Sequence, residues 1–253
     1  MKRFILHAAI APLALMTPAL ATDIIDMTDT ERDVFRAEVR AYLMENPEVL
    51  LEAIAVLDER QAVEETASDS ALLLQNAEAI YNDGASFVGG NPDGDITIVE
   101  FADYNCGYCK KAHPEVAELL ASDGNIRLIY KEFPILGPDS LTSAKFAMAT
   151  LMVSGPEAYG KVNNALMNKR GAPSNEALVK LANSFDLDAD AVIAKMDSPE
   201  VMQIIQANRA LGQALKISGT PTFIMGDQLV RGYLPLENMR DIVEQVRAAN
   251  PKD

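Results

Sequence analysis

The feature that most constrains this chain is the placement of its two cysteines. Cys106 and Cys109 are the only cysteines among 253 residues, and two residues separate them. Residues 96–101 form a short apolar run typical of a strand, and a helical pattern extends from Cys109 to about residue 122. We therefore expect the pair in a strand-to-helix connection, with Cys106 at the helix N-terminus.

Two cysteines cannot build a disulfide scaffold, and an apolar fraction of 49% supplies a core without one. A Cys106–Cys109 disulfide would close a ring of four residues, which stabilises a fold by only about 2 kcal/mol. Stability is thus a weak reason for the pair, and two interpretations remain: half of a metal site, or a redox pair. Zinc would need a carboxylate or a second chain, because His113 is the single histidine after residue 21.

A redox pair explains the placement better. Unpaired backbone N–H groups and the helix dipole favour a thiolate at a helix N-terminus, so Cys106 is expected to be the nucleophile. Cys109 lies one turn further in, where it would be shielded and would resolve a mixed disulfide. Gly107 lets a substrate chain approach closely, and Tyr108 would stack on that chain or cover Cys109.

Residues 22–82 predict a helical extension. Thr28 and Glu31 have the spacing of a capping box, and Asn46-Pro47 marks a second helix start. Polar residues 68–70 predict a break before a third helix over 72–81. The apolar stripes of these helices need a cover, which is either the main domain or a second copy of the chain.

Residues 83–253 predict an α/β domain. Strand patterns at 96–101 and 126–130 flank the helix that carries the cysteines, which indicates a βαβ unit. Successive helical patterns over about 138–215 predict an inserted helical block. Strands at 222–225 and 228–231, joined by a Gly-Asp turn, and a final helix over 236–249 follow.

Residues 1–21 are expected to be a cleaved secretory signal peptide. Basic residues at 2 and 3 precede an apolar run that ends in Ala-Leu-Ala. Prolines at 12 and 18 weigh against the alternative, an uncleaved membrane anchor. We therefore expect the protein in the periplasm. The net charge of −15, or −17 without the two basic residues, argues against nucleic acid as a partner.

Two segments resemble the DsbA family of thioredoxin-fold thiol-disulfide oxidoreductases. One is Glu-Phe-Ala-Asp-Tyr-Asn-Cys-Gly-Tyr-Cys-Lys-Lys-Ala-His at 100–113, and the other is Ser-Gly-Thr-Pro-Thr-Phe at 218–223. The helical extension is similar to that of ScsC-like proteins. The resemblance covers about residues 85–253 and implies an α/β, thioredoxin-like fold with an inserted helical domain and an N-terminal helical extension.

The resemblance also implies supporting residues. Pro221 is expected to be cis beside the cysteines, with Thr220 tuning the thiolate and presenting its backbone to an extended client. Glu100 matches the buried acid that the family uses to move protons to the inner cysteine. The alternative interpretation is that Glu100 is an exposed carboxylate at a strand edge. His113 is expected to be solvated or to cap the helix.

The implied activity is an enzyme that exchanges disulfides with unfolded or misoxidised secreted proteins, without a cofactor, and is recycled by a membrane redox partner. Strongly oxidising members carry Pro-His between the cysteines, whereas Gly107-Tyr108 supplies no cation. We expect an isomerase or reductase, favoured further if residues 22–82 form a homo-oligomer; a monomer would favour a dithiol oxidase. One alternative hypothesis is a copper-binding protein that uses the two thiolates, since ScsC-like proteins are associated with copper tolerance. Another is a thioredoxin-like binding module whose cysteines are incidental.

Overall fold

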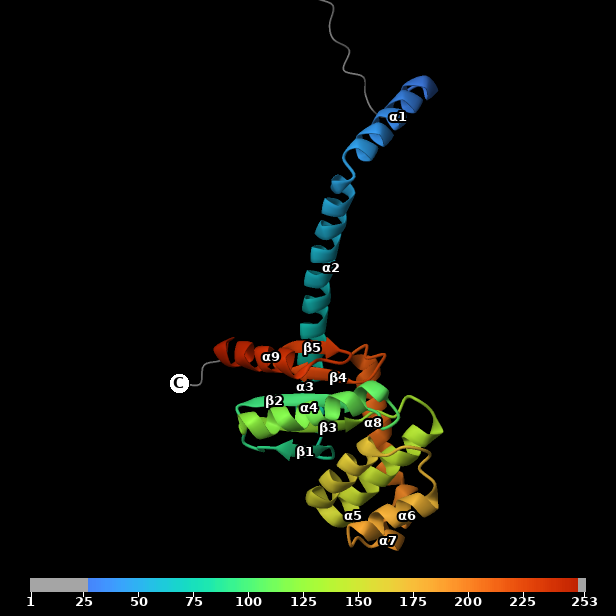
Figure 1. Cartoon of the computed structure of the whole chain (residues 1–253), viewed down its shortest axis with the longest axis vertical. Helices are drawn as coiled ribbons and strands as arrows, with labels where there is room; N and C mark the ends of the chain where they lie inside the picture. The colour runs from blue at the N-terminus through green and yellow to red at the C-terminus, as the bar shows by residue number, and fades with distance from the viewer. Residues whose placement is uncertain (1–26, 250–253) are drawn as a thin grey trace, which may run out of the picture. The chain divides into compact units, whose positions relative to one another are not determined.

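The computed structural model describes residues 27–249 (Figure 1). The expected signal peptide lies outside the described residues. The chain divides into two compact units, one ending at Arg60 and one beginning at Gln61, and this boundary falls inside the helix α2 (Glu48–Gln75). Within residues 27–249, no helix is long and apolar enough to cross a membrane.

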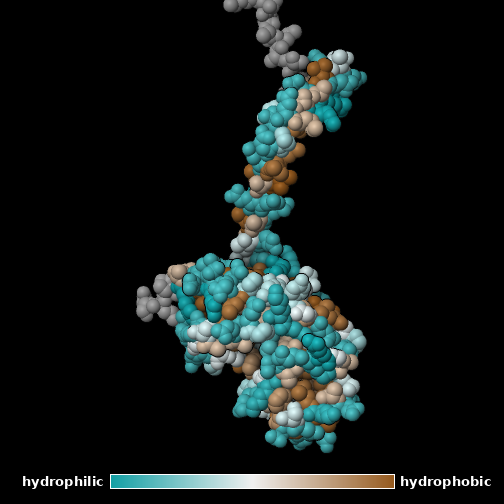
Figure 2. Space-filling view, viewed as in Figure 1, coloured by the Kyte–Doolittle hydropathy of each residue, from teal (hydrophilic) through white to brown (hydrophobic). Residues whose placement is uncertain are grey.

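The first unit comprises α1 (Asp29–Glu45) and the first part of α2. The predicted capping box is confirmed: the Glu31 N–H donates to Thr28 Oγ1, and the Thr28 N–H donates to the Glu31 carboxylate at 2.8 Å. Asn46 ends α1, with its N–H bonded to Tyr42 O, and α2 begins at Glu48. Figure 2 shows apolar side chains along both helices, and the large exposed ones up to Arg60 are Val34, Phe35, Val39, Tyr42, Met44, Leu50, Leu51, Ile54, Val56 and Leu57.

The later part of α2 differs from the prediction. The helix runs without interruption through residues 68–70 to Gln75, so the third helix is only α3 (Ala77–Tyr81). Asp69 explains the difference, because its buried carboxylate accepts hydrogen bonds of 2.7 and 2.8 Å from Arg231. A polar residue that predicted a break instead fastens the helix to β5 (Gln228–Arg231).

A mixed sheet organises the second unit. Among the described residues its strand order is β1-β3-β2-β4-β5. The parallel strands β2 (Ile96–Ala102) and β3 (Ile126–Glu132) are joined by α4 (Gly107–Asp123), which confirms the βαβ unit. Antiparallel to these run β1 (Phe87–Gly90), beside β3, and β4 (Thr222–Met225), beside β2. The predicted hairpin of β4 and β5 is confirmed.

Side-chain alternation gives β2 and β3 two different faces. Even-numbered residues such as Ile98 and Leu128 pack against α4 and α9 (Leu236–Ala249). Odd-numbered residues such as Val99 and Ile129 pack against α3 and α8 (Pro199–Ala214). The sheet is therefore buried on both faces, which places β2 at the centre of the unit.

The inserted helical block lies between β3 and β4 in sequence, as predicted. It consists of α5 (Pro138–Asn168), α6 (Asn175–Ser184), α7 (Ala189–Met196) and α8, with α5, α6 and α7 grouped beyond one end of the sheet (Figure 1). The long helix α5 is kinked at Gly155, whose φ of 81° favours glycine. The block packs on Cys109 and its neighbours in one buried cluster.

Candidate active site

The cysteines lie where β2 passes into α4. Cys106 is the N-cap of α4, and its Sγ accepts a hydrogen bond of 3.4 Å from the Cys109 N–H. Both thiols are free; Cys106 is 7% exposed, and Cys109 is fully enclosed. These positions confirm the predicted geometry: the Cys106 sulfur lies at the helix N-terminus, and the Cys109 sulfur is shielded one turn further on.

The loop before β4 reaches the outer cysteine from 114 residues further along the chain. The Cys106 thiol donates to Thr220 O at 3.2 Å, and the Thr220–Pro221 peptide bond is cis. The structure thus brings Thr220 and Pro221 against Cys106, with the Thr220 carbonyl directed at its sulfur.

Asp103, which sequence reasoning missed, fixes the cysteine loop. It is 1% exposed and accepts hydrogen bonds from the N–H groups of Asn105, Ile135 and Leu136, at 2.8, 2.8 and 3.0 Å. Its own carbonyl accepts from the Cys106 N–H. An Asp between a strand and a cysteine pair is a turn signal that would have indicated the first of these contacts. The other two contacts, from Ile135 and Leu136, connect Asp103 to the loop after β3, which is distant in sequence.

Glu100 is buried in β2, between β3 and β4, so the alternative of an exposed carboxylate at a strand edge is wrong. Burial raises the pKa of Glu100 to about 8. Burial also raises the pKa of the Cys109 thiol, and negative charge on Cys106 or Glu100 adds to this effect. The inner thiol therefore needs a base close by, and a carboxyl of raised pKa is suited to that task.

A second buried carboxyl, Glu132 at the end of β3, was also missed. Its Oε1 accepts hydrogen bonds from the hydroxyls of Tyr104, at 2.7 Å, and Tyr159, at 2.6 Å. Asn163 Nδ2 donates to the Tyr104 hydroxyl at 3.0 Å. Burial raises the pKa of Glu132 to about 8, and the two tyrosine hydroxyls oppose that rise. The signal available in the sequence was a charged residue, next to Lys131, at the end of a mostly apolar strand.

Gly107 and Tyr108 form the outer rim of the site. Gly107 is exposed, and a Cβ there would meet no atom of the described chain within 4 Å. Tyr108 is 62% exposed, and its ring lies beside Tyr233, with 6.2 Å between centroids. Tyr108 therefore leaves Cys109 to be covered by other residues and presents its ring to solvent next to Cys106.

The cations near the helix start are engaged elsewhere. Lys110 Nζ donates to Lys169 O at 2.6 Å, and Lys111 Nζ lies 4.0 Å from the centroid of the Tyr233 ring. The half-buried His113 ring contacts Asn164 Oδ1 at 3.0 Å, so the ring is partly solvated and has a side-chain partner on α5.

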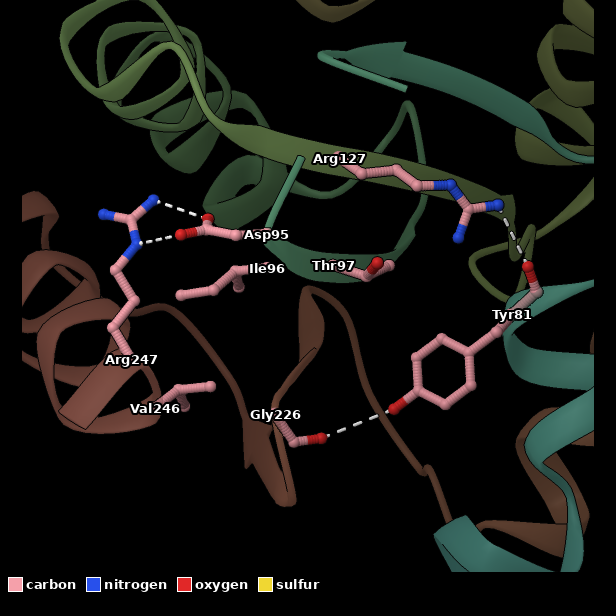
Figure 3. Close-up of a pocket in the computed structure, with 8 residues that line it drawn as sticks. All are labelled: Tyr81, Asp95, Ile96, Thr97, Arg127, Gly226, Val246 and Arg247. Carbon is pink, nitrogen blue, oxygen red and sulfur yellow. Dashed lines mark hydrogen bonds and ion pairs between the residues drawn. The ribbon is translucent and has the colours of Figure 1, made fainter. Parts of the chain in front are cut away.

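Two features outside the cysteine loop bear on ligand binding. Among residues 27–249, no three His, Cys, Asp or Glu side chains gather as a metal site would require. A cavity of about 470 Å³ lies at the opposite end of β2, beside Ile96 (Figure 3). Its polar groups bind one another: Arg247 pairs with Asp95, and Arg127 donates to Tyr81 O. This cavity is distinct from the cysteine site.

Comparison with known proteins matches most of the chain. The model of a DSBA-like thioredoxin domain matches residues 97–244, and that of the copper resistance protein ScsC N-terminal domain matches residues 31–64. A thioredoxin-like oxidoreductase from Silicibacter pomeroyi DSS-3 is 38% identical over 68% of this chain and 97% of that chain, with a TM-score of 0.63. Proteus mirabilis ScsC in a transitional conformation is 28% identical over 88% of this chain and 100% of that one, with a TM-score of 0.65.

Curated relatives extend the comparison. The thiol:disulfide interchange protein DsbC of Escherichia coli (strain K12) is 28% identical over 149 residues, which are 58% of this chain and 50% of that protein. The Na(+)/H(+) antiporter NhaA 1 of Salinispora arenicola is 26% identical over 170 residues, 66% of this chain. The chain spans only 26% of that antiporter's length. The domain match includes both cysteines and covers more than half of the sequence. This chain belongs to the DSBA-like thioredoxin domain family.

Proposed function

We propose that this chain is a periplasmic thiol-disulfide oxidoreductase that acts on secreted client proteins through Cys106 and Cys109, in the isomerase or reductase direction. The observation that carries the proposal is the unequal pair: Cys106 caps α4 at the rim, while Cys109 is enclosed one turn behind it. Such a pair separates attack on a client from resolution of the mixed disulfide.

The reaction uses each sulfur once. The Cys106 thiolate attacks a client disulfide, a Cys106–client bond forms, and one client sulfur leaves as a thiolate. Cys109 then loses its proton to the Glu100 carboxylate and attacks Cys106 Sγ, which releases the reduced client and leaves a Cys106–Cys109 disulfide. In isomerisation, a second client thiol attacks the mixed disulfide instead, and Cys106 is regenerated.

The rim residues would hold the client. Thr220 and Pro221 present backbone beside Cys106, where an extended client segment would bind. Exposed Tyr108 offers an aromatic surface, and Gly107 leaves the approach to the sulfur open. We assign all four residues to client positioning.

The direction of exchange follows from what stabilises the Cys106 thiolate. Gly107 and Tyr108 carry no cation, and Lys110 and Lys111 are engaged by a carbonyl and an aromatic ring. A weakly stabilised thiolate makes the disulfide form less oxidising, which favours isomerase or reductase activity supplied with electrons by a membrane redox partner. The exposed apolar residues of α1 and the first part of α2 support a homo-oligomer, in which several cysteine pairs would serve one client.

Copper binding is the weaker alternative. A Cu(I) ion would rest on the two thiolates alone, and one of them is enclosed. In the described chain, no third metal-binding side chain joins them as part of a metal cluster. Disulfide exchange makes use of the different exposure of the two sulfurs, whereas metal binding does not.

Substitution of each cysteine in turn tests the proposal. Cys106→Ser is expected to abolish insulin reduction, because no outer nucleophile remains. Cys109→Ser is expected to keep the first attack and to accumulate mixed disulfides with clients, visible as dithiothreitol-sensitive adducts on gels. Insulin reduction by Cys106→Ser at the rate of the unchanged protein would refute the assignment.

A further inference from the structure

The register of β2 and β3 places two carboxyl groups on one face of the sheet. Glu100 lies opposite Tyr130, and Ala102 lies opposite Glu132, in parallel pairing. Because side chains alternate along a strand, Glu100, Tyr130 and Glu132 all face the same side. Tyr130, Ala102 and Cys109 belong to one buried cluster, so this is the side on which the inner thiol lies.

The two carboxyl groups differ in what stabilises their anions. Both are buried, at 2% and 0% exposure. Glu132 Oε1 receives two hydroxyl donors, Tyr104 and Tyr159, and Asn163 orients the first of them by donating to its oxygen. Burial raises the pKa of both carboxyl groups, and at Glu132 the two hydroxyls oppose that rise. Hydrogen bonds to the charged form favour it, and the two tyrosine hydroxyls supply such bonds to Glu132.

We propose that Glu132 is a positioning residue for disulfide exchange: its carboxylate, held by Tyr104 and Tyr159, carries the negative charge of the buried pair and makes Glu100 a stronger base toward Cys109. This inference rests on the proposed function, because it assigns a role within the same reaction. Glu132 does not touch the reacting sulfurs; it acts through Glu100.

The physical basis is repulsion between like charges in a poorly solvated cluster. With Glu132 ionised, ionisation of Glu100 costs more, so Glu100 holds a proton more strongly. Proton transfer from the enclosed thiol is easier to a base whose proton affinity approaches that of the thiol. When Cys109 passes its proton to Glu100, its thiolate attacks Cys106 Sγ and the client sulfur departs, while the charge on Glu132 is unchanged.

Other titratable groups face the same cluster. Burial raises the pKa of Glu132, and negative charge on Asp103 or Glu100 adds to that rise, while Asp103 itself accepts three backbone N–H groups. The groups that face Glu132 from the elements packed around it are Glu100 of β2, Asp103 and Tyr104 of the following loop, Tyr130 of β3 and Tyr159 of α5. Cys109 of α4 faces Tyr130 in turn.

A single-turnover experiment isolates the step that Glu100 serves. The reduced full-length protein is mixed with excess 5,5′-dithiobis(2-nitrobenzoate), which loads Cys106 with one nitrothiobenzoate and releases another. The second release reports the attack of Cys109 on Cys106 and is followed by stopped-flow absorbance from pH 5 to 9. In the unchanged protein, this rate is expected to rise as Glu100 ionises.

Glu132→Gln removes the charge and keeps the shape. We expect the midpoint of the pH–rate profile to move down by about one pH unit or more, because Glu100 then ionises more easily. Tyr159→Phe removes one donor from Glu132 and is expected to shift the midpoint in the same direction. Combined with Glu132→Gln, it is expected to add no further shift, because both changes act through one carboxylate.

Lys131→Met is the matched control. Lys131 is buried in the same strand but faces the other side, where it donates to Ala79 O and Asp83. It is expected to lower stability and leave the midpoint in place. Equal midpoints in the unchanged protein and Glu132→Gln, or Tyr159→Phe should the first variant not fold, would overturn the inference and leave the proposed function intact. Failure of the unchanged protein to release the second nitrothiobenzoate would instead refute the proposed function.

Discussion

Glu100 holds its proton more tightly in the folded chain than in the unfolded chain. Burial raises its pKa from the ordinary value of 4.5 to about 8. Between these values the unfolded chain releases the proton and the folded chain keeps it, so the unfolded state binds fewer protons and stability falls as pH rises. The same residue that serves the inner thiol thus costs stability at neutral and alkaline pH.

Glu100→Gln tests this cost. Between pH 5 and pH 8, the unchanged protein is expected to lose on the order of 2 kcal/mol more unfolding free energy than the variant, because glutamine cannot ionise. Urea denaturation at the two pH values measures the difference. Glu118→Gln, an exposed change on α4, is the control and is expected to follow the unchanged protein. Parallel pH dependence in Glu100→Gln and the unchanged protein would contradict the assignment of Glu100 as a buried acid.

At the scale of elements, a pair of residues distant in sequence holds the end of α2 on the sheet. Arg231 of β5 donates to both oxygens of Asp69, 162 residues away in sequence, and also to Glu65. The Asp69 side chain is 10% exposed, and that of Glu65 is 66% exposed. The buried, two-point contact is therefore the one that matters for stability.

Asp69→Asn is expected to lower the unfolding free energy by about 2 kcal/mol, because it breaks a charged hydrogen-bond pair and leaves Arg231 incompletely bonded. The control Glu65→Gln is expected to cost less than about 0.5 kcal/mol, since the Glu65 side chain is exposed to solvent. Urea midpoints measure both, and insulin reduction should be unchanged in both variants. Equal losses in the two variants would show that burial of Asp69 is unimportant.

The contact between Asp69 and Arg231 also shows which features the sequence could predict and which it could not. Local patterns located β2, α4 and the hairpin, because apolar periodicity and turn residues are properties of neighbouring positions. The continuity of α2 through residues 68–70 depends on Arg231, and no pattern near Asp69 reveals that partner. Glu132 was missed for the same reason: its meaning arises only when β3 lies beside β2 and Tyr159 of α5 reaches it.

At the scale of the whole molecule, the family assignment covers the domain that carries the cysteines. The proposed direction of disulfide exchange depends on the groups that surround the Cys106 sulfur. Cys106 receives a hydrogen bond from the Cys109 N–H, and its thiol donates to Thr220 O. Gly107 and Tyr108 add no cation. We therefore expect a weaker oxidant than family members with a cation between the cysteines, in keeping with the proposed isomerase or reductase role.

The reduction potential of the Cys106–Cys109 pair, measured by equilibration of the full-length protein with glutathione, tests this claim most directly. We predict a value of about −180 mV or lower, because little besides the helix N-terminus stabilises the Cys106 thiolate. A value near −120 mV, typical of a strong dithiol oxidase, would contradict it.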